Sequence, residues 1–174
     1  MNQPFVEAIF NNLALLLPLR VVNSYERGVR FRGGRDIAEL EPGVHWFIPG
    51  YEAIEIVNVA PETRNLPTQT VTTKDKVDVT FSANVCYKIT DARKMFVSVQ
   101  SFDEAMIAFA MCHLATAVGD NTFASLLRNR EQLESELAES LAAKVASWGA
   151  DIEWVGFTDL TRAKAYRLFG DMSI

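Results

Sequence analysis

The strongest structural signal in this chain is the stretch PETRNLPTQTVTTKDKVDVTFSANVCYKI, residues 61–89. Every odd position in residues 77–89 carries an apolar residue, and every even position between them carries a polar residue or Cys86. Successive side chains of a strand point to opposite faces, so this alternation predicts a long strand with one apolar and one polar face. Residues 63–72 form a weaker strand pattern, and the polar turn at 73–76 joins the two into an antiparallel hairpin.

The residues before this hairpin predict a run of short strands. The expected segments are residues 20–25, 28–32, 44–48 and 51–59. The first two flank a turn at residues 26–28 and are predicted to pair as a second hairpin, after which the glycine pair at 33–34 breaks the pattern. In the last segment, Ile54 is placed on the apolar face and Glu52 on the polar face.

Beyond the long hairpin the apolar period changes from two to about 3.6, which indicates helices. Helices are expected at residues 90–99, 102–118, 122–127, 130–148 and 163–169, with a last strand at 151–160. Ser101 with Glu104, and Asn129 with Gln132, match the capping-box pattern that opens a helix. The sequence therefore predicts an α+β fold, in which antiparallel strands with a long hairpin are packed by several helices.

The helix expected at residues 102–118 is apolar nearly all round. A helix without a polar face must be covered on all sides. Its most apolar part, about 14 residues, is shorter than the roughly 20 residues that a spanning helix needs. We therefore expect the sheet to cover one side of it and another subunit to cover the other. The candidate subunit contacts are Met106, Phe109, Ala110 and His113.

The most apolar block of the chain lies at its beginning, in residues 4–20. No Lys or Arg precedes its apolar run, unlike in a secretory signal, and the run is too short to cross a bilayer as a helix. Read as a short helix, the block has a broad apolar face that suits either a membrane interface or packing onto the domain or a neighbouring subunit. The candidate membrane-contact residues are Phe5, Val6, Ile9, Phe10, Leu13, Leu16 and Leu17.

Composition and charge exclude several classes of protein. The 174 residues are 49% hydrophobic and 22% charged, which is ordinary for one globular domain. A net charge of −5 provides no basic face for nucleic acid. The two cysteines, Cys86 and Cys112, are too few for a disulfide scaffold and indicate either a reducing compartment or indifference to redox conditions.

The sequence contains no motif with recognisable catalytic or metal-binding chemistry. Its two histidines, His45 and His113, lie far apart in the chain. Zinc-protease, paired-cysteine, nucleophile-elbow and phosphate-loop patterns do not occur. We therefore expect no catalytic, cofactor-binding or metal-binding residues, and no enzyme activity.

Six short motifs resemble those of a known family. Residues 22–34, VNSYERGVRFRGG, resemble the opening of stomatins, and residues 41–49, EPGVHWFIP, resemble a segment that stomatins and prohibitins share. Gln69 with TKDKV at 73–77 resembles the hairpin of the same group. Later matches are YKITD at 87–91, LLRNRE at 126–131, and Trp148-Gly149 before Asp159-Leu160. Because these matches keep their order from Val21 to Leu160, the chain is similar to the SPFH (band 7, stomatin/prohibitin) domain family.

The resemblance implies a membrane scaffold without catalysis. Family members are held at a membrane face by an N-terminal apolar segment, and they assemble into rings or cages. Such homo-oligomers organise membrane patches and regulate membrane-bound partners such as a protease or a channel. For this chain the resemblance implies contact with membrane lipid, a peripheral or monotopic location on the cytoplasmic face, and no nucleic-acid partner.

The resemblance also gives domain boundaries. We expect an apolar membrane-contacting segment at residues 1–19, the SPFH domain at 20–161 and a short tail at 162–174. The chain departs from the family in two ways. No long coiled coil follows the domain before the sequence ends, and the apolar anchor is shorter than a spanning helix or a re-entrant hairpin. A soluble, small-oligomer binding adaptor that uses the same fold is the alternative.

Overall fold

The computed structural model describes residues 18–163, apart from the side chains of Asp36 and Ile37. The chain forms two compact units. Unit 1 contains the residues up to Ala60 together with Ile89–Gln100, and unit 2 contains Pro61–Lys88 together with the residues from Ser101 onward. The predicted N-terminal helix and the predicted helix after Ala163 lie outside the described residues.

The long hairpin forms the centre of unit 2, as predicted. Its strands are β6 (Glu62–Thr72) and β7 (Asp78–Ile89), which pair antiparallel. The odd positions of β7 from Val79 onward are all buried. Cys86 is buried as well, although its position belongs to the predicted polar face. The apolar alternation therefore predicted the strand and its buried face correctly.

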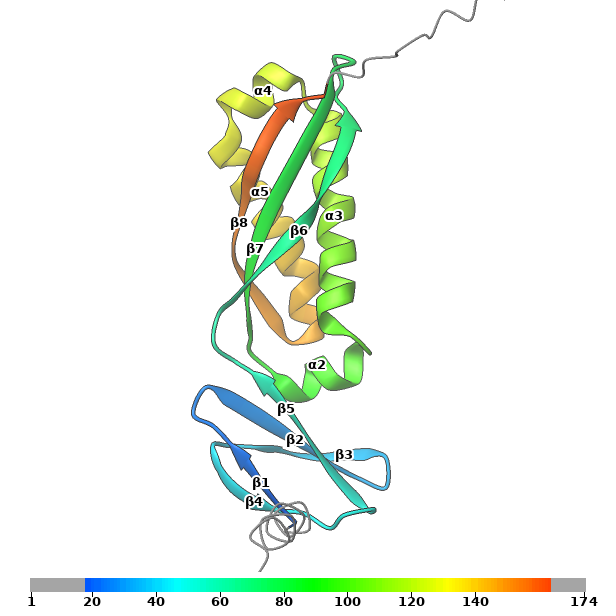
Figure 1. The fold of residues 1–174 in the computed structure, drawn as a ribbon, viewed down its shortest axis with the longest axis vertical. Helices are drawn as coiled ribbons and strands as arrows, with labels where there is room; N and C mark the ends of the chain where they lie inside the picture. Colours follow the sequence, from blue (N-terminus) through cyan, green and yellow to red (C-terminus); the bar gives the residue numbers. More distant parts are fainter. Residues whose placement is uncertain (1–17, 164–174) are drawn as a thin grey trace, which may run out of the picture. The chain divides into compact units, whose positions relative to one another are not determined.

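The remaining strand and helices of unit 2 complete a sheet with helices on one face. The sheet order is β6-β7-β8, and the helices α3 and α5 pack on this sheet and on each other (Figure 1). The bounds are α3 (Phe102–Asp120), α4 (Phe123–Arg128), α5 (Arg130–Val145), the 3-10 helix η1 (Ala146–Trp148) and β8 (Ala150–Arg162). β8 runs two residues beyond the predicted end at Leu160. The Ala163 N–H that follows it donates to the carbonyl oxygen of Asp78 (2.8 Å) at the start of β7.

The two predicted capping boxes are wrong, although the helices that they were to open are present. Neither Ser101 nor Asn129 makes a side-chain hydrogen bond to the helix that follows it. Asn129 ends α4 as well as preceding α5, and its φ of −111° and ψ of 32° differ from the extended backbone usual at a helix start. The start of α3 is held instead through Asp103, as described below.

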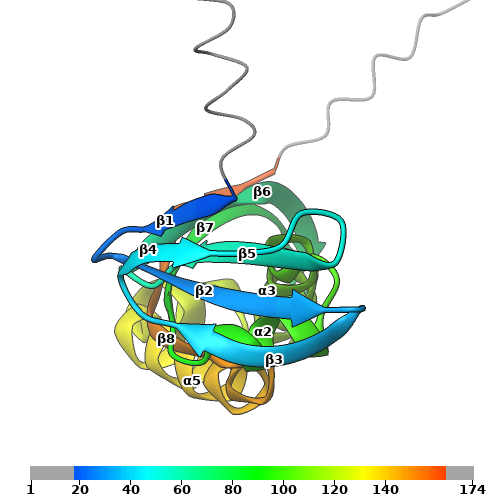
Figure 2. The ribbon, with the colours of Figure 1, turned by 90° about the horizontal axis from the view of Figure 1, so that it is seen from below.

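Unit 1 contains two small sheets and one helix. The three-stranded sheet has the order β3-β2-β5, and the two-stranded sheet, here called the ribbon, pairs β1 with β4. Figure 2 shows the ribbon along one side of the three-stranded sheet. The bounds are β1 (Leu19–Val22), β2 (Glu26–Arg32), β3 (Arg35–Leu40), β4 (Gly43–Trp46), β5 (Glu52–Asn58) and α2 (Ala92–Ser98).

The predicted hairpin between residues 20–25 and 28–32 is wrong. β2 pairs with β3 on one edge and with β5 on the other, so neither edge is left for β1, which pairs with β4. The strand that the sequence missed, β3, begins directly after Gly33 and Gly34. These two glycines have φ of 56° and 77°, the left-handed backbone of a tight two-residue hairpin turn. The glycine pair therefore joins two strands where the sequence pattern suggested only a break.

The prediction that Glu52 lies on the polar face of its strand is also wrong. Glu52 shares the parity of Ile54 and is 7% exposed. It lies opposite Arg32 on β2, which donates from Nε and Nη2 to Oε1 at 2.8 and 2.5 Å. The N–H of Ile48 donates to Oε2 at 3.0 Å. These hydrogen bonds offset the free-energy cost of burying the Glu52 carboxylate, since a charge is tolerated in a protein core only when it is paired and hydrogen-bonded.

We expect Glu52 to make unit 1 sensitive to acid. Its hydrogen bonds from Arg32 and from the backbone of Ile48 hold the pKa of Glu52 below its usual value. A depressed pKa in the folded state stabilises the fold above the unfolded-state pKa, and this stability is lost as pH falls through the folded pKa. Glu52→Gln should lower the thermal midpoint of unfolding at pH 7. The difference in thermal midpoint between the variant and wild type should shrink near about pH 3.

The matched control for this prediction is Glu55→Gln, which changes an exposed carboxylate of the same strand. It should leave the midpoint almost unchanged at both pH values. If Glu52→Gln lowered the thermal midpoint by the same amount at both pH values, the stabilising role assigned to the Glu52 charge would be contradicted.

Candidate interaction surfaces

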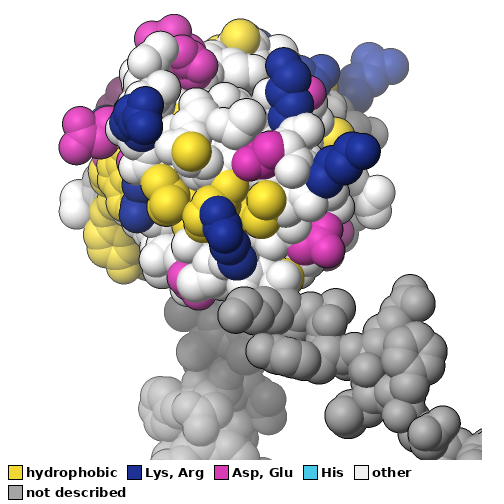
Figure 3. Space-filling view, turned by 90° about the horizontal axis from the view of Figure 1, so that it is seen from above, with side chains coloured by type: hydrophobic (Ala, Val, Ile, Leu, Met, Phe, Trp, Pro, Cys, Tyr) yellow, Lys and Arg dark blue, Asp and Glu magenta, His cyan; other side chains and the backbone are white. Residues whose placement is uncertain are grey.

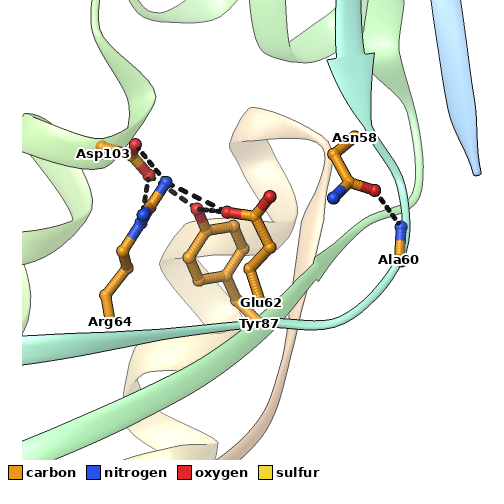
Figure 4. Close-up of polar contacts among 6 residues, drawn as sticks. All are labelled: Asn58, Ala60, Glu62, Arg64, Tyr87 and Asp103. Atoms are coloured by element: carbon orange, nitrogen blue, oxygen red, sulfur yellow. Dashed lines mark hydrogen bonds and ion pairs between the residues drawn. The ribbon is translucent and has the colours of Figure 1, made fainter.

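A polar cluster joins the base of the long hairpin to the start of α3 (Figure 4). The Tyr87 hydroxyl donates to Asp103 Oδ1 at 2.6 Å, and Arg64 Nη2 donates to Asp103 Oδ2 at 2.8 Å. The same Arg64 nitrogen lies 3.0 Å from Glu62 Oε2. Burial, and then the neighbouring Asp103 carboxylate, raise the pKa of Tyr87 above its usual value. The phenol therefore stays protonated and remains a donor, which fixes the first turn of α3 on the hairpin.

We expect Tyr87→Phe to lower the free energy of unfolding by about 1–2 kcal/mol, because it removes one charge-assisted hydrogen bond from a buried ring. Asp103 is partly exposed, so water can replace part of the lost bond. The measurement is chemical denaturation. Tyr25→Phe is the control, because that side chain is 54% exposed. Equal losses in both variants would show that the Asp103 contact contributes nothing.

The turn of the long hairpin is hydrogen-bonded to the loop that connects α3 and α4. The hydroxyl of the buried Thr73 donates to Asp75 Oδ1 at 2.5 Å, and the same oxygen accepts the N–H of Phe123 at 3.2 Å. The N–H of Lys74 donates to the carbonyl oxygen of Asn121 at 3.0 Å. The Thr73 bond is the largest cause that lowers the pKa of Asp75. The TKDKV motif therefore has a structural role, which is to hold the tip of the hairpin against the helices.

Side chains suited to catalysis are not gathered together in the part of the chain that the structure describes. No group of three His, Cys, Asp or Glu that could hold a metal ion occurs among residues 18–163. His45 Nε2 lies 2.7 Å from the carbonyl oxygen of Glu41, and His113 Nδ1 lies 3.3 Å from Ser140 Oγ. Both histidines thus have local partners, on different units.

The ribbon of unit 1 has a continuous apolar face that is open to solvent. Leu19 pairs directly with Trp46, and Val21 pairs directly with Val44. Directly opposed residues on one face are close enough for their side chains to touch. Their exposures are 43%, 62%, 57% and 65% in that order. These four residues are here called the apolar ribbon face. Leu19 is the last residue of the apolar first segment of the sequence, and Val21 lies two positions after it.

The ribbon is tied to the rest of unit 1 by backbone and core contacts. Arg30 Nη2 on β2 donates to the carbonyl oxygen of Trp46 at 3.0 Å. Val22, which points away from the apolar ribbon face, is 2% exposed in the core. The apolar ribbon face is therefore held on a folded support and is not a frayed end.

The candidate membrane-contact residues of the first segment all lie outside the described residues. They are Phe5, Val6, Ile9, Phe10, Leu13, Leu16 and Leu17. The apolar ribbon face is the surface that sequence reasoning missed. Its signal was present as apolar residues two apart in both strands, but the pairing that brings the strands together could not be read from the chain.

The structure separates the four candidate subunit contacts into two pairs. Met106 and Ala110 are 1% and 0% exposed and point into the core of unit 2, so their side chains are not available to a partner. Phe109 and His113 are half-buried, with ring centres 4.3 Å apart. The Phe109 ring also lies 6.0 Å from that of Trp148. Of the four candidates, only Phe109 and His113 remain on the surface.

α3 is longer than its apolar pattern suggested. Its 19 residues make it the one described helix whose length and hydropathy would allow it to cross a membrane. Here α3 packs against β6 and α5 and buries a stripe along one side, as a helix that lies on one face of a sheet does. The prediction that α3 is too short to span is therefore wrong, but its packing on the sheet agrees with the sequence.

Comparisons with known proteins match this architecture. The sequence model of the SPFH domain / Band 7 family matches residues 20–167. The chain is 33% identical over 135 residues to an uncharacterised protein of Methanocaldococcus jannaschii, a match that covers 78% of this chain and 68% of that protein.

Two stomatins are also similar. A stomatin homologue of Pyrococcus horikoshii is 28% identical over 152 residues, covering 87% of this chain and 57% of that protein. Stomatin-1 of Caenorhabditis elegans is 26% identical over 149 residues, covering 85% of this chain and 45% of that protein. The chain thus spans about half the length of these stomatins. The family match extends over most of the chain, so the protein belongs to the SPFH domain / Band 7 family.

Proposed function

We propose that this protein is a membrane-associated, self-assembling scaffold of the stomatin/prohibitin type. It contacts lipid through the apolar ribbon face together with the apolar first segment. It contacts further copies of itself through the side of α3 that carries Phe109 and His113, here called the outer side of α3. In this role it organises a membrane patch or regulates membrane-bound partners such as a protease or a channel. The proposal involves no catalysis, cofactor or nucleic acid.

The observation that carries the proposal is the apolar ribbon face. Single exposed apolar residues are ordinary, whereas a continuous apolar patch on a soluble surface marks a contact with protein or membrane. Here four large apolar side chains are paired across two strands, and the first of these strands, β1, begins at the end of the most apolar block of the chain. A membrane interface accepts both, because each can bury its apolar side while the chain remains on one side of the bilayer.

Self-assembly is supported by the outer side of α3. Phe109 and His113 stay half-exposed there with Trp148 beside them, and Lys144 Nζ lies 5.5 Å from the centre of the Trp148 ring. Aromatic residues of this kind are enriched at the contacts between proteins. The contact surface proposed for a second copy therefore keeps Phe109 and His113 and omits Met106 and Ala110.

The proposal places the protein on the cytoplasmic face of the membrane. Cys86 and Cys112 are both free thiols, and Cys112 is exposed. Exposed free thiols persist best in a reducing compartment.

Flotation with phosphatidylcholine vesicles tests the proposed lipid contact, and light scattering of the protein alone tests the proposed self-assembly. The chain should rise with the vesicles, and its mass in solution should be that of several copies. A chain that stays below the vesicles and scatters as a monomer would refute the scaffold.

A soluble adaptor with the same fold is the second candidate. It is favoured by the fact that unit 2 buries Met106, Ala110 and the rest of the α3 stripe within itself. An adaptor would form small oligomers and would not float, so the same two measurements separate the candidates.

A further inference from the structure

A groove of about 360 Å³ runs between α3 and α5 on unit 2. Its apolar part is provided by Ala117, Leu133 and Leu137, and its carboxylates are those of Asp120 and Glu136. This volume is within the range of sites that enclose several apolar groups. The groove begins beside His113, so it continues the side of α3 proposed above for contact between copies.

A second surface lies at the end of unit 2 that carries the hairpin turn and α4. Leu127 is 55% exposed there, and Phe123 lies one helical turn before it with the Arg162 guanidinium 4.5 Å above its ring. Lys74 and Lys76 of the turn are both exposed. Figure 3 shows this end, with hydrophobic side chains among Lys and Arg and among Asp and Glu side chains. These five residues are here called the tip patch.

The tip patch contains cationic side chains and the groove contains carboxylates, and both surfaces lie at one end of unit 2. The Lys74 N–H donates to the carbonyl oxygen of Asn121, and Asn121 also lines the groove, so both surfaces lie at the same end of unit 2. The two surfaces lie on different sides of α4. Ser125 lines the small cavity that continues the groove, and Leu127 of the tip patch is two positions further along the helix. Residues two positions apart in a helix do not face the same side. One copy therefore cannot bring its own tip patch into its own groove.

We propose that the tip patch of one copy docks in the α3–α5 groove of the next copy. This inference rests on the self-assembly proposed above and names the surface that each copy offers. Leu127 enters the apolar part of the groove, while the cations around it face Asp120 and Glu136. Two parallel copies placed side by side bring these surfaces to the same height, since both are at one end of the unit.

The contact is head-to-tail, because the two surfaces that meet are different. Repeating such a contact around a rotation axis generates a closed ring, whereas a contact between two identical patches stops at a dimer. The opposite charges of the two surfaces also disfavour the two wrong pairings, tip to tip and groove to groove.

Two variants that each damage one surface test the head-to-tail contact. Leu127→Asp damages the tip patch, and Glu136→Arg puts a cation into the groove. Each variant alone should lose the wild-type assembly, with self-association weakened about tenfold or more. An equal mixture should form a one-to-one dimer and nothing larger, because only one intact pair of surfaces remains. Mass photometry of each variant and of the mixture measures this.

The control is Glu139→Arg, which makes the same charge change on an exposed position of α5 that does not line the groove. It should assemble like wild type, and circular dichroism should confirm that every variant is folded. Wild-type mass for Leu127→Asp or for Glu136→Arg would overturn the contact. A mixture without dimers would overturn it as well. If Phe109→Glu still reduces the mass in either case, self-assembly stands and only the head-to-tail contact falls.

Discussion

Replacing Val44 and Trp46 together by Asp is expected to lower the binding of this protein to phosphatidylcholine vesicles by about 100-fold. Burying one large apolar side chain is worth about 1.5–3 kcal/mol, and each 1.4 kcal/mol is a factor of ten in affinity. Both residues are more than half exposed, and their side chains leave the core of unit 1 untouched. The variant should therefore remain folded, which circular dichroism checks.

Val97→Asp is the matched control for this change. Val97 is 64% exposed on α2, also in unit 1, but it is not part of the apolar ribbon face. Its replacement adds a carboxylate without removing a lipid contact, so flotation should stay near that of wild type. If both variants float equally well, the ribbon does not face lipid, and the first segment alone would have to account for any membrane contact.

Phe109→Glu is expected to reduce the assembly to single chains, with the dissociation constant raised about 100-fold. The substitution removes an aromatic contact with His113 and Trp148 and would place an unpaired charge in the contact between copies. An unpaired buried charge is strongly unfavourable. Light scattering over a range of concentrations measures the change.

Ala108→Glu is the control for the assembly prediction. Ala108 is exposed on the same helix, lies about 100° around it from Phe109, and does not line the groove. It should keep the wild-type mass. An unchanged mass for Phe109→Glu would show that the outer side of α3 is not the contact, whatever Ala108→Glu does.

Local patterns predicted the parts of the fold whose partners are close in sequence. The alternation from Val77 to Ile89 predicted β7 and its buried face, and the apolar period of about 3.6 predicted the main helices that follow. Both patterns work because strand and helix periods place every second or every third to fourth side chain on one face. Ordered motifs from Val21 to Leu160 added the family, which the comparisons confirm.

Pairing between distant segments decided what those patterns could not. Whether Glu52 is buried depends on the presence of Arg32 across the sheet, and whether Leu19 and Trp46 form one surface depends on β1 pairing with β4 and not with β2. Met106 and Phe109 look equally apolar in the sequence, yet only the packing of α3 against the sheet buries one and leaves the other half-exposed.

The α+β class, the long hairpin, the main helices and the family could be predicted from the amino-acid sequence, because each depends on residues near one another in the chain. Which apolar residues lie in the core, and which remain on the surface as the apolar ribbon face, the groove and the tip patch, depended on tertiary packing. The exposure of a side chain is set by the distant segment that covers it, and the local period of the sequence carries no information about that segment.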